Sequence, residues 1–199
     1  MKKRLLIATN NPGKVAEIQA LLTGLDLELV TPADVGLTLE VVEDGQTYAE
    51  NARLKALAFA QASGLISLAD DSGLEVDALD GRPGLHSNRF GPQPTSDQSR
   101  RRYLLEQLTG KPQPWTARFR ATVAVAWPDG AVRLTEGICE GEIIAEERGS
   151  NGFGYDPLFL LPELGRTMAE LSMDEKNRLS HRARAVRQAI PILLDIQKA

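Results

Sequence analysis

The stretch GLISLADDSGLEVDAL, residues 64–79, decides the fold, because an apolar run leads there directly into charged and small residues. Leu65–Ala69 predicts a short buried strand. Asp70–Ser72 follow at its expected end, before Gly73 lets the chain turn into Leu74–Leu79. Since the carboxyl ends of strands are where α/β sheets bind ligands, we expect a functional site at this point.

The segments that precede this stretch alternate between strand and helix. Thr47–Ser63 predicts an Ala-rich helix, with Gly64 as its C-terminal stop. Lys3–Ala8 and Leu27–Val30 predict strands. A polar loop and a helix lie between these two strands, and the apolar residues of that helix share one face: Val15, Ile18, Leu21 and Leu22.

The second half of the chain adds an antiparallel ribbon. Ser96–Leu108 predicts a helix, and Thr116–Trp127 alternates as a long strand does. A hairpin signal at 129–130 joins it to a return strand, Ala131–Ile144. A last helix is expected over about Ser180–Ile196. The fold class is therefore α/β, with a mixed, partly antiparallel twisted sheet and flanking helices.

Composition narrows the class of protein. The 199 residues are 42% hydrophobic and 25% charged, which excludes disordered and fibrous classes and fits one domain over residues 1–199. A single cysteine excludes an internal disulfide. No apolar stretch approaches the roughly 18 residues that cross a bilayer, so we expect no membrane association and a cytoplasmic location. The net charge of −4 argues against a broad nucleic-acid surface, but it leaves room for a small anionic ligand.

The polar loop near the N-terminus is a candidate phosphate site. It follows a strand and opens a helix, so backbone N–H groups and the helix dipole suit a phosphate, and Lys14 adds a full charge. It is not a Walker A loop, because Ala8 and Val15 stand where a glycine and a Ser or Thr are needed. The alternative is a structural cap, in which Asn11 caps the helix and Pro12 starts it.

Asp70 and Asp71 are adjacent on a predicted strand, so their side chains should point to opposite faces. A single carboxylate that binds magnesium and takes a proton from water fits this better than a shared-proton pair. Glu43, in an acidic loop, is a possible second metal ligand. The alternative is a turn that Asp-Asp-Ser-Gly forms by local hydrogen bonds.

Two further segments are candidates for ligand recognition. Gly149–Pro157 is rich in glycine, which lets backbone approach a flat ligand, while Phe153 or Tyr155 could stack on a base. His181 and Arg182 begin the last helix and could donate to a carbonyl oxygen or a phosphate. An ordinary loop and a surface charge pair are the respective alternatives.

Three other features favour structural roles. The run Arg100–Arg102 has Asp97 and Glu106 nearby on the same predicted helix, which indicates a solvated face. His86 is too isolated for a metal cluster. Cys139 lies within a predicted strand.

Taken together, the segments resemble the inosine triphosphate pyrophosphatase family, enzymes that hydrolyse non-standard purine nucleoside triphosphates to a monophosphate and pyrophosphate. The resemblance spans nearly the whole chain and rests on five motifs in the family's order: Thr9-x-Asn11-x-x-Lys14, Glu50-Asn51-Ala52 with Lys55, Ala69-Asp70-Asp71-Ser72-Gly73-Leu74, Gly152-Phe153-Gly154-Tyr155-Asp156-Pro157, and Ser180-His181-Arg182.

The resemblance implies two lobes around a central cleft, a homodimer and dependence on Mg²⁺. It implies that Asp71 is the catalytic base and a metal ligand, and that Glu43 is the other metal carboxylate. The residues it assigns to substrate binding are Thr9, Asn10, Asn11, Pro12, Gly13, Lys14, Lys55, Ser72, Phe153, Gly154, Tyr155, Asp156, Lys176, His181 and Arg182.

The expected reaction is in-line attack of water on the α-phosphorus, with ITP, dITP and XTP as substrates. Hydrogen-bond donors would suit the 6-oxo group of hypoxanthine or xanthine and would reject the 6-amino group of adenine. Two alternatives remain: a nucleotide-binding regulator without turnover, and a pyrophosphatase for another modified nucleotide class, such as a modified pyrimidine triphosphate.

Overall fold

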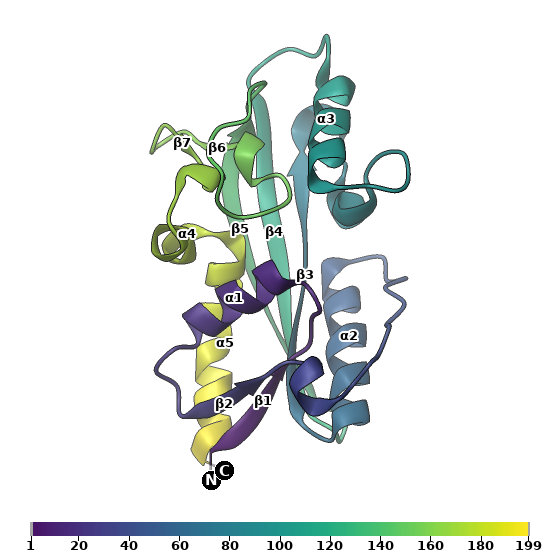
Figure 1. Ribbon diagram of the computed structural model, residues 1–199, viewed down its shortest axis with the longest axis vertical. Helices are drawn as coiled ribbons and strands as arrows, with labels where there is room; N and C mark the ends of the chain where they lie inside the picture. Colours follow the sequence, from purple (N-terminus) through teal and green to yellow (C-terminus); the bar gives the residue numbers. More distant parts are fainter. Residues whose placement is uncertain (1, 199) are drawn as a thin grey trace. The chain divides into compact units, whose positions relative to one another are not determined.

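Seven strands form one mixed sheet in the order β2-β1-β3-β4-β5-β6-β7 (Figure 1). The computed structural model describes residues 2–198. β1 pairs in parallel with β2 and β3, whereas β6 pairs in antiparallel with β5 and β7. The strands are β1 Lys3–Ile7, β2 Leu27–Val30, β3 Ile66–Val76, β4 Trp115–Ala126, β5 Val132–Ile143, β6 Phe159–Leu161 and β7 Arg166–Thr167. The prediction of a mixed α/β sheet is confirmed.

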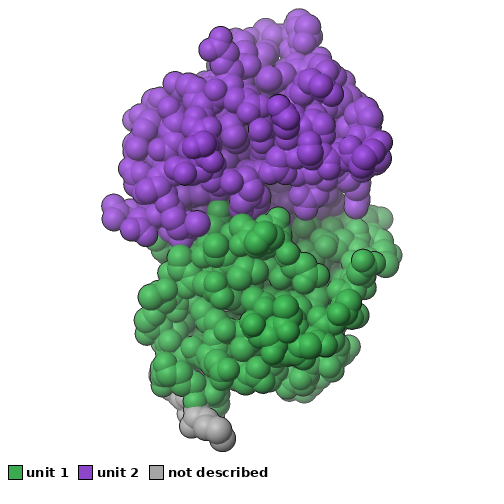
Figure 2. Space-filling view, viewed as in Figure 1, with its two compact units in different colours: residues 1–71, 121–137, 181–199 green, residues 72–120, 138–180 purple. Residues whose placement is uncertain are grey.

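Five α-helices accompany the strands within residues 2–198: α1 Pro12–Leu21, α2 Tyr48–Ser63, α3 Asp97–Leu108, α4 Met173–Leu179 and α5 His181–Lys198. The chain divides into two compact units (Figure 2). Unit 1 contains the chain up to Asp71, Ala121–Gly137 and the segment from His181 onward. Unit 2 contains Ser72–Arg120 and Ile138–Ser180. No helix in the described part of the chain is long and apolar enough to cross a membrane.

The sheet of unit 1 is covered on both faces. Leu5, Ile7 and Leu68 pack with α1 and α5, while their sequence neighbours Leu6 and Ala69 pack with α2. This division follows from the alternation of side chains along a strand, and Figure 1 shows α2 opposite α1 and α5 in this unit. The predicted apolar residues Val15, Ile18 and Leu21 of α1, and Leu22 at its C-cap, all join the α1–α5 side of the core.

Unit 2 has a core of its own around the aromatic side chains Trp115, Phe119, Tyr155 and Phe159. Leu104 and Leu108 of α3 pack into it, as does Cys139, which is buried and free. The structural interpretation of this cysteine is therefore confirmed.

The prediction that the chain turns at Gly73 is wrong, and so is the alternative of an Asp-Asp-Ser-Gly turn. Residues 66–76 form one continuous strand, β3. The reason lies beyond the glycine: Leu74 and Val76 are fully buried in the core of unit 2, and the N–H of Leu74 donates to Ser87 Oγ at 2.9 Å. Burial of these apolar side chains outweighs the local turn preference of the residues before them.

Asp70 and Asp71 consequently lie in the middle of β3, but just beyond the end of β1. Ile7 is in register with Leu68, and the N–H of Ala8 donates to the carbonyl of Leu68 at 2.8 Å. Since β1 and β3 run in parallel, the loop that follows β1 begins beside the two aspartates.

Candidate active site

The loop after β1 ends in the predicted cap. Asn11 Oδ1 accepts hydrogen bonds from the N–H groups of Gly13 at 2.9 Å and Lys14 at 3.2 Å, and Pro12 is the first residue of α1. Thr9 Oγ1 in turn accepts from the N–H of Asn11 at 3.2 Å. The cap therefore occupies two of the backbone N–H groups that were expected to bind a phosphate, and Lys14 supplies the positive charge at this helix start.

A buried ionic cluster lies between β3, α1 and α5 in unit 1. Lys14 Nζ is 3.1 Å from Asp70 Oδ2, and Arg182 Nε donates to the same oxygen at 3.0 Å. Arg182 Nη1 also binds the carboxylate of Glu17, one turn along α1 from Lys14. The four residues, which we call the ionic cluster, are at most 7% exposed. Burial of so many charges is tolerated only because each cation faces a carboxylate.

The charges of the ionic cluster perturb one another strongly. Burial opposes ionisation of Asp70, but the cations of Lys14 and Arg182 outweigh it and hold the pKa of the carboxyl well below its usual value. Burial lowers the pKa of Lys14, with Asp70 opposing that shift. For Arg182 the carboxylates of Asp70 and Glu17 overcome burial and raise the pKa further. The surroundings therefore favour the ionised forms of Asp70 and Arg182.

The opposite face of β3 presents Asp71 to helix α2. Asn51 Nδ2 donates to Asp71 Oδ2 at 3.1 Å. Lys55, one turn further along α2, places Nζ 3.0 Å from Glu43 Oε1 and donates to the carbonyl of Asp70 at 3.1 Å. The i, i+4 spacing puts Asn51 and Lys55 on the same face of the helix. The expectation that Asp70 and Asp71 point to opposite faces is thus confirmed.

Asp71 has the electrostatics of a proton acceptor. Burial raises the pKa of its carboxyl above the usual value, and the nearby Glu43 acts in the same direction. Lys55, Lys14 and the hydrogen bond from Asn51 oppose the rise. A carboxylate with a raised pKa is a stronger base than an ordinary aspartate, and such perturbed groups concentrate at functional sites.

Asp71 and Glu43 also fit a magnesium ion by the chemistry of their donors. Mg²⁺ prefers oxygen ligands, and it is commonly held by one or two carboxylates together with substrate phosphates. Within residues 2–198, no three His, Cys, Asp or Glu side chains form a group that could hold a metal by themselves. The residues therefore suit an ion that shares its ligands with a substrate, and not a closed structural site.

Unit 2 contains the glycine-rich loop, residues 149–157. Asp156 Oδ2 accepts from the N–H of Phe153 at 2.9 Å and from Lys176 Nζ at 2.5 Å. Gly152 has φ +74°, and a Cβ there would lie 2.0 Å from that same oxygen, so only glycine fits. Lys176 Nζ also lies 4.9 Å from the ring centroid of Phe153, within cation–π range.

The two aromatic residues of this loop differ in their surroundings. Tyr155 is buried and its hydroxyl donates to the carbonyl of Ser87 at 2.9 Å, and burial raises its pKa. Phe153 is partly exposed. Of the two rings, Phe153 is therefore the more exposed.

Comparison with known proteins identifies the chain. The sequence model of the Ham1 family matches residues 5–192. The chain belongs to the Ham1 family. Relatives in this family include the dITP/XTP pyrophosphatase of Desulforamulus reducens, 49% identical over 96% of this chain and 95% of that protein. A dITP/XTP pyrophosphatase of Thermus thermophilus is 47% identical over 96% and 92% of the respective chains. Among solved structures, the HAM1 protein of Coxiella burnetii is similar with a TM-score of 0.88 and 37% identity, covering 97% of this chain and 99% of that one.

The predicted site residues of this Ham1 chain fall into two groups, one in each unit. Unit 1 holds the Thr9–Lys14 loop, Glu43, Lys55 and Asp71. At the start of α5, in the same unit, His181 and Arg182 are both buried. Unit 2 holds Ser72, the first residue after the boundary, together with Phe153, Gly154, Tyr155, Asp156 and Lys176.

Sequence reasoning did not assign roles to three residues that hold the group in unit 1 together. Glu17 binds Arg182, Asn51 binds Asp71, and Asp70 joins Lys14 to Arg182. Helical spacing is the signal that could have found two of them: Glu17 is three residues after Lys14, and Asn51 is four residues before Lys55.

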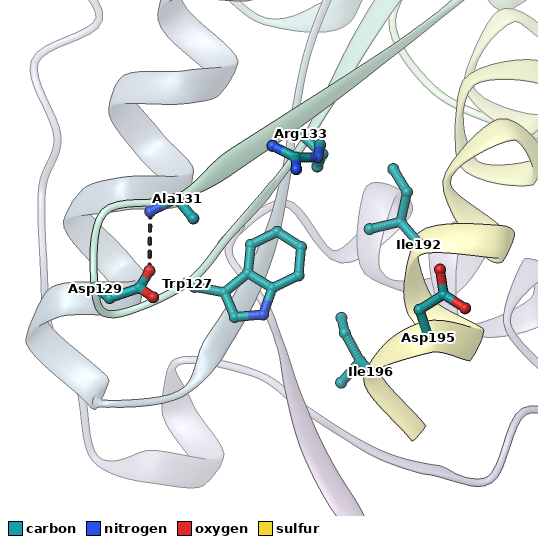
Figure 3. A pocket seen from close by; sticks show the side chains of 7 residues that line it. All are labelled: Trp127, Asp129, Ala131, Arg133, Ile192, Asp195 and Ile196. Atoms are coloured by element: carbon teal, nitrogen blue, oxygen red, sulfur yellow. Dashed lines mark hydrogen bonds between the residues drawn. The ribbon is translucent and has the colours of Figure 1, made fainter. Parts of the chain in front are cut away.

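A separate hollow of about 390 Å³ lies at the β4–β5 turn (Figure 3). The indole ring of Trp127 faces Ile192 and Ile196 of α5 across it, and Arg133 lies at its edge. None of its lining residues is a predicted site residue, so it is distinct from the groups described above.

Proposed function

We propose that the chain hydrolyses ITP, dITP and XTP to the nucleoside monophosphate and pyrophosphate in a Mg²⁺-dependent reaction. The observation that carries the proposal is the arrangement around Asp71: a carboxylate with a raised pKa, oriented by Asn51, with Lys55 and Glu43 on the same face of β3. The names of the relatives, dITP/XTP pyrophosphatases, supply the substrate class.

In this proposal Asp71 orients a water molecule and removes its proton as the water attacks the α-phosphorus. Such general-base assistance contributes about 10²–10⁴-fold to a rate. Lys55 and Lys14 provide fixed positive charge for the phosphates, and both are held in place by contacts with Asp70. Mg²⁺, when held by Asp71 and Glu43, would offset charge on the phosphate oxygens.

We assign recognition of the nucleobase to the remaining predicted residues. Phe153 offers a ring for stacking, and donors from His181, Arg182 or the N–H groups of the glycine-rich loop would select a 6-oxo group over a 6-amino group. A mismatch that leaves buried polar groups unpaired discriminates by about 10⁴–10⁵-fold, which is enough to protect ATP.

The location and assembly of the enzyme complete the proposal. We place it in the cytoplasm, where it would remove these nucleotides before they enter DNA or RNA, and we expect a homodimer without a nucleic-acid partner. Sedimentation at micromolar concentration checks the dimer: a single species at the 21.7 kDa monomer mass would contradict it.

The test of the proposed function is hydrolysis of ITP beside ATP and GTP with Mg²⁺, with all phosphate products resolved. We expect inosine monophosphate and pyrophosphate, and little turnover of ATP. Diphosphate with orthophosphate would place the attack at the γ-phosphorus and overturn the mechanism. Binding without any turnover would favour a nucleotide-binding regulator.

A matched pair of variants tests the role of Asp71 as the catalytic base. Asp71→Asn should lower kcat with ITP by about 10²–10⁴-fold while leaving the fold intact. Asp26→Asn is the control, because that carboxylate belongs to the same unit and its side chain is 76% exposed. Equal kcat for the two variants would remove Asp71 from the mechanism.

A further inference from the structure

Helix α3 binds both backbone polar groups, the N–H and the carbonyl, of Gly154 in the glycine-rich loop. Asp97 Oδ2 accepts from the N–H of Gly154 at 2.7 Å, and Arg101 Nη1 donates to the carbonyl of Gly154 at 2.9 Å. The two side chains are four residues apart, so they project from the same face of the helix. Both hydrogen bonds involve a charged group, which makes them stronger than bonds between neutral partners.

The two clamping side chains are themselves fixed. The other carboxylate oxygen of Asp97 binds Arg100, and Arg101 Nε lies 2.8 Å from Glu147 Oε1. The side chain of Arg101 is only 14% exposed. The next residue, Arg102, differs: its side chain is 78% exposed and its partner is Glu106, one turn away on the same helix. The side chain of Arg100 is 12% exposed, so in the run 100–102, interpreted from sequence as a solvated face, only Arg102 is largely exposed.

The position of Gly154 explains why a clamp is useful there. Its φ is +62°, and a Cβ at this residue would have no heavy atom within 4 Å, so the backbone borders open space on that side. Tyr155 on one side is anchored in the core, whereas Phe153 on the other side is partly exposed. Asp97 thus holds the peptide group that joins Phe153 to Gly154, and Arg101 holds the next one, between Gly154 and Tyr155, so the backbone directly after Phe153 is fixed.

We propose that Asp97 and Arg101 are positioning residues for substrate selection, which hold the glycine-rich loop in the conformation that contacts the base. This inference rests on the proposed function of that loop. The two residues act through Gly154 and Phe153, and the hydrolytic step at Asp71 does not require them. Their loss should therefore weaken recognition of the base more than it slows the chemical step.

The experiment compares Arg101→Met and Asp97→Ala with the wild-type enzyme, using ITP and ATP. We expect KM for ITP to rise at least fivefold, with kcat within about twofold of wild type. The ratio of kcat/KM for ITP to that for ATP should fall. Asp97→Asn, which keeps an oxygen able to accept from the Gly154 N–H, should recover at least half of the lost kcat/KM. Arg102→Gln is the matched control and should behave as wild type.

A second measurement separates the clamp from general loss of fold. Hydrogen exchange followed by NMR should show faster exchange of the Gly154 amide in Arg101→Met and Asp97→Ala, while amides of the α3 interior keep their protection. Unchanged KM and unchanged substrate ratio in both variants would overturn the inference while the proposed function stands. A wild-type protein that releases no pyrophosphate from ITP would overturn both together.

Discussion

Replacing Glu17 with glutamine tests how much the ionic cluster stabilises unit 1. The substitution keeps the size of the side chain and one oxygen acceptor, but it removes one of the two carboxylates that face Arg182. The remaining carboxylate, Asp70, is shared with Lys14. The guanidinium of Arg182, whose side chain is 2% exposed, is therefore left with one carboxylate that it shares with Lys14, and water does not reach it.

The expected cost follows from the burial. Removing one partner of a buried ion pair costs about 3–5 kcal/mol, and the retained acceptor places this substitution at the lower end, about 3 kcal/mol. For a chain of 150–250 residues each kcal/mol corresponds to about 2–4 °C, so Tm should fall by about 6–12 °C. Because proteins are stable by only about 5–15 kcal/mol, this is a large share of the total.

The assay is urea unfolding at pH 7, followed by circular dichroism and by tryptophan fluorescence. The two tryptophans report on different units, Trp127 on unit 1 and Trp115 on unit 2, so a Trp115→Phe background isolates the unit with the cluster. Glu106→Gln is the matched control: it removes the same charge beside Arg102 on an exposed helix face and should cost about 0.3–0.5 kcal/mol. If Glu17→Gln costs no more than this control, the cluster does not stabilise the fold and the reasoning fails.

Three further predictions concern Asp71, the metal and the packing of β5. Asn51→Leu removes a hydrogen bond that lowers the pKa of Asp71, so the acid limb of kcat/KM should move to higher pH, because a protonated carboxyl cannot accept a proton; a shift to lower pH would contradict this. Glu43→Gln should weaken the apparent affinity for Mg²⁺ by about tenfold or more, measured by titrating Mg²⁺ into enzyme from which metal has been removed with a chelator. Unchanged affinity would show that Glu43 is not a ligand of the metal. Gly141→Ala should lower the free energy of unfolding by about 1–3 kcal/mol in urea, because its Cβ would lie 2.5 Å from the carbonyl oxygen of Leu160, and a loss below about 0.5 kcal/mol would show that the strands separate easily.

Local signals in the sequence were enough for most of the fold. Gly64 ends α2 as predicted, and the predicted first residue, Thr47, is its N-cap, because helix ends depend on their own backbone neighbourhood. β2 has the predicted bounds Leu27–Val30. The prediction of a turn at Gly73 was wrong because the continuation of β3 depends on residues distant in sequence. Leu74 and Val76 pack in a core with Leu104 and Trp115, which no local pattern contains.

The candidate site shows the same limit at the level of side chains. Alternation along a strand correctly predicted that Asp70 and Asp71 face opposite sides, but it could not say which helix covers each side. The structure places α1 and α5 with Asp70, and α2 with Asp71. One carboxylate is thereby surrounded by cations and kept ionised well below its usual pKa, while its neighbour is surrounded by fewer and has a raised pKa.

Because their surroundings differ, the two adjacent aspartates are suited to different roles. A carboxylate with a strongly lowered pKa is a poor base, since its charge is already stabilised, but it is a good anchor for Lys14 and Arg182. A carboxylate with a raised pKa gains more by taking a proton, so Asp71 is the one suited to activate water. The two functions need different surroundings within one peptide unit of each other, and a strand covered on both faces supplies them. Lys14 and Arg182 lie on the Asp70 face of β3, so exchanging the roles of the two aspartates would require moving both cations to the other face.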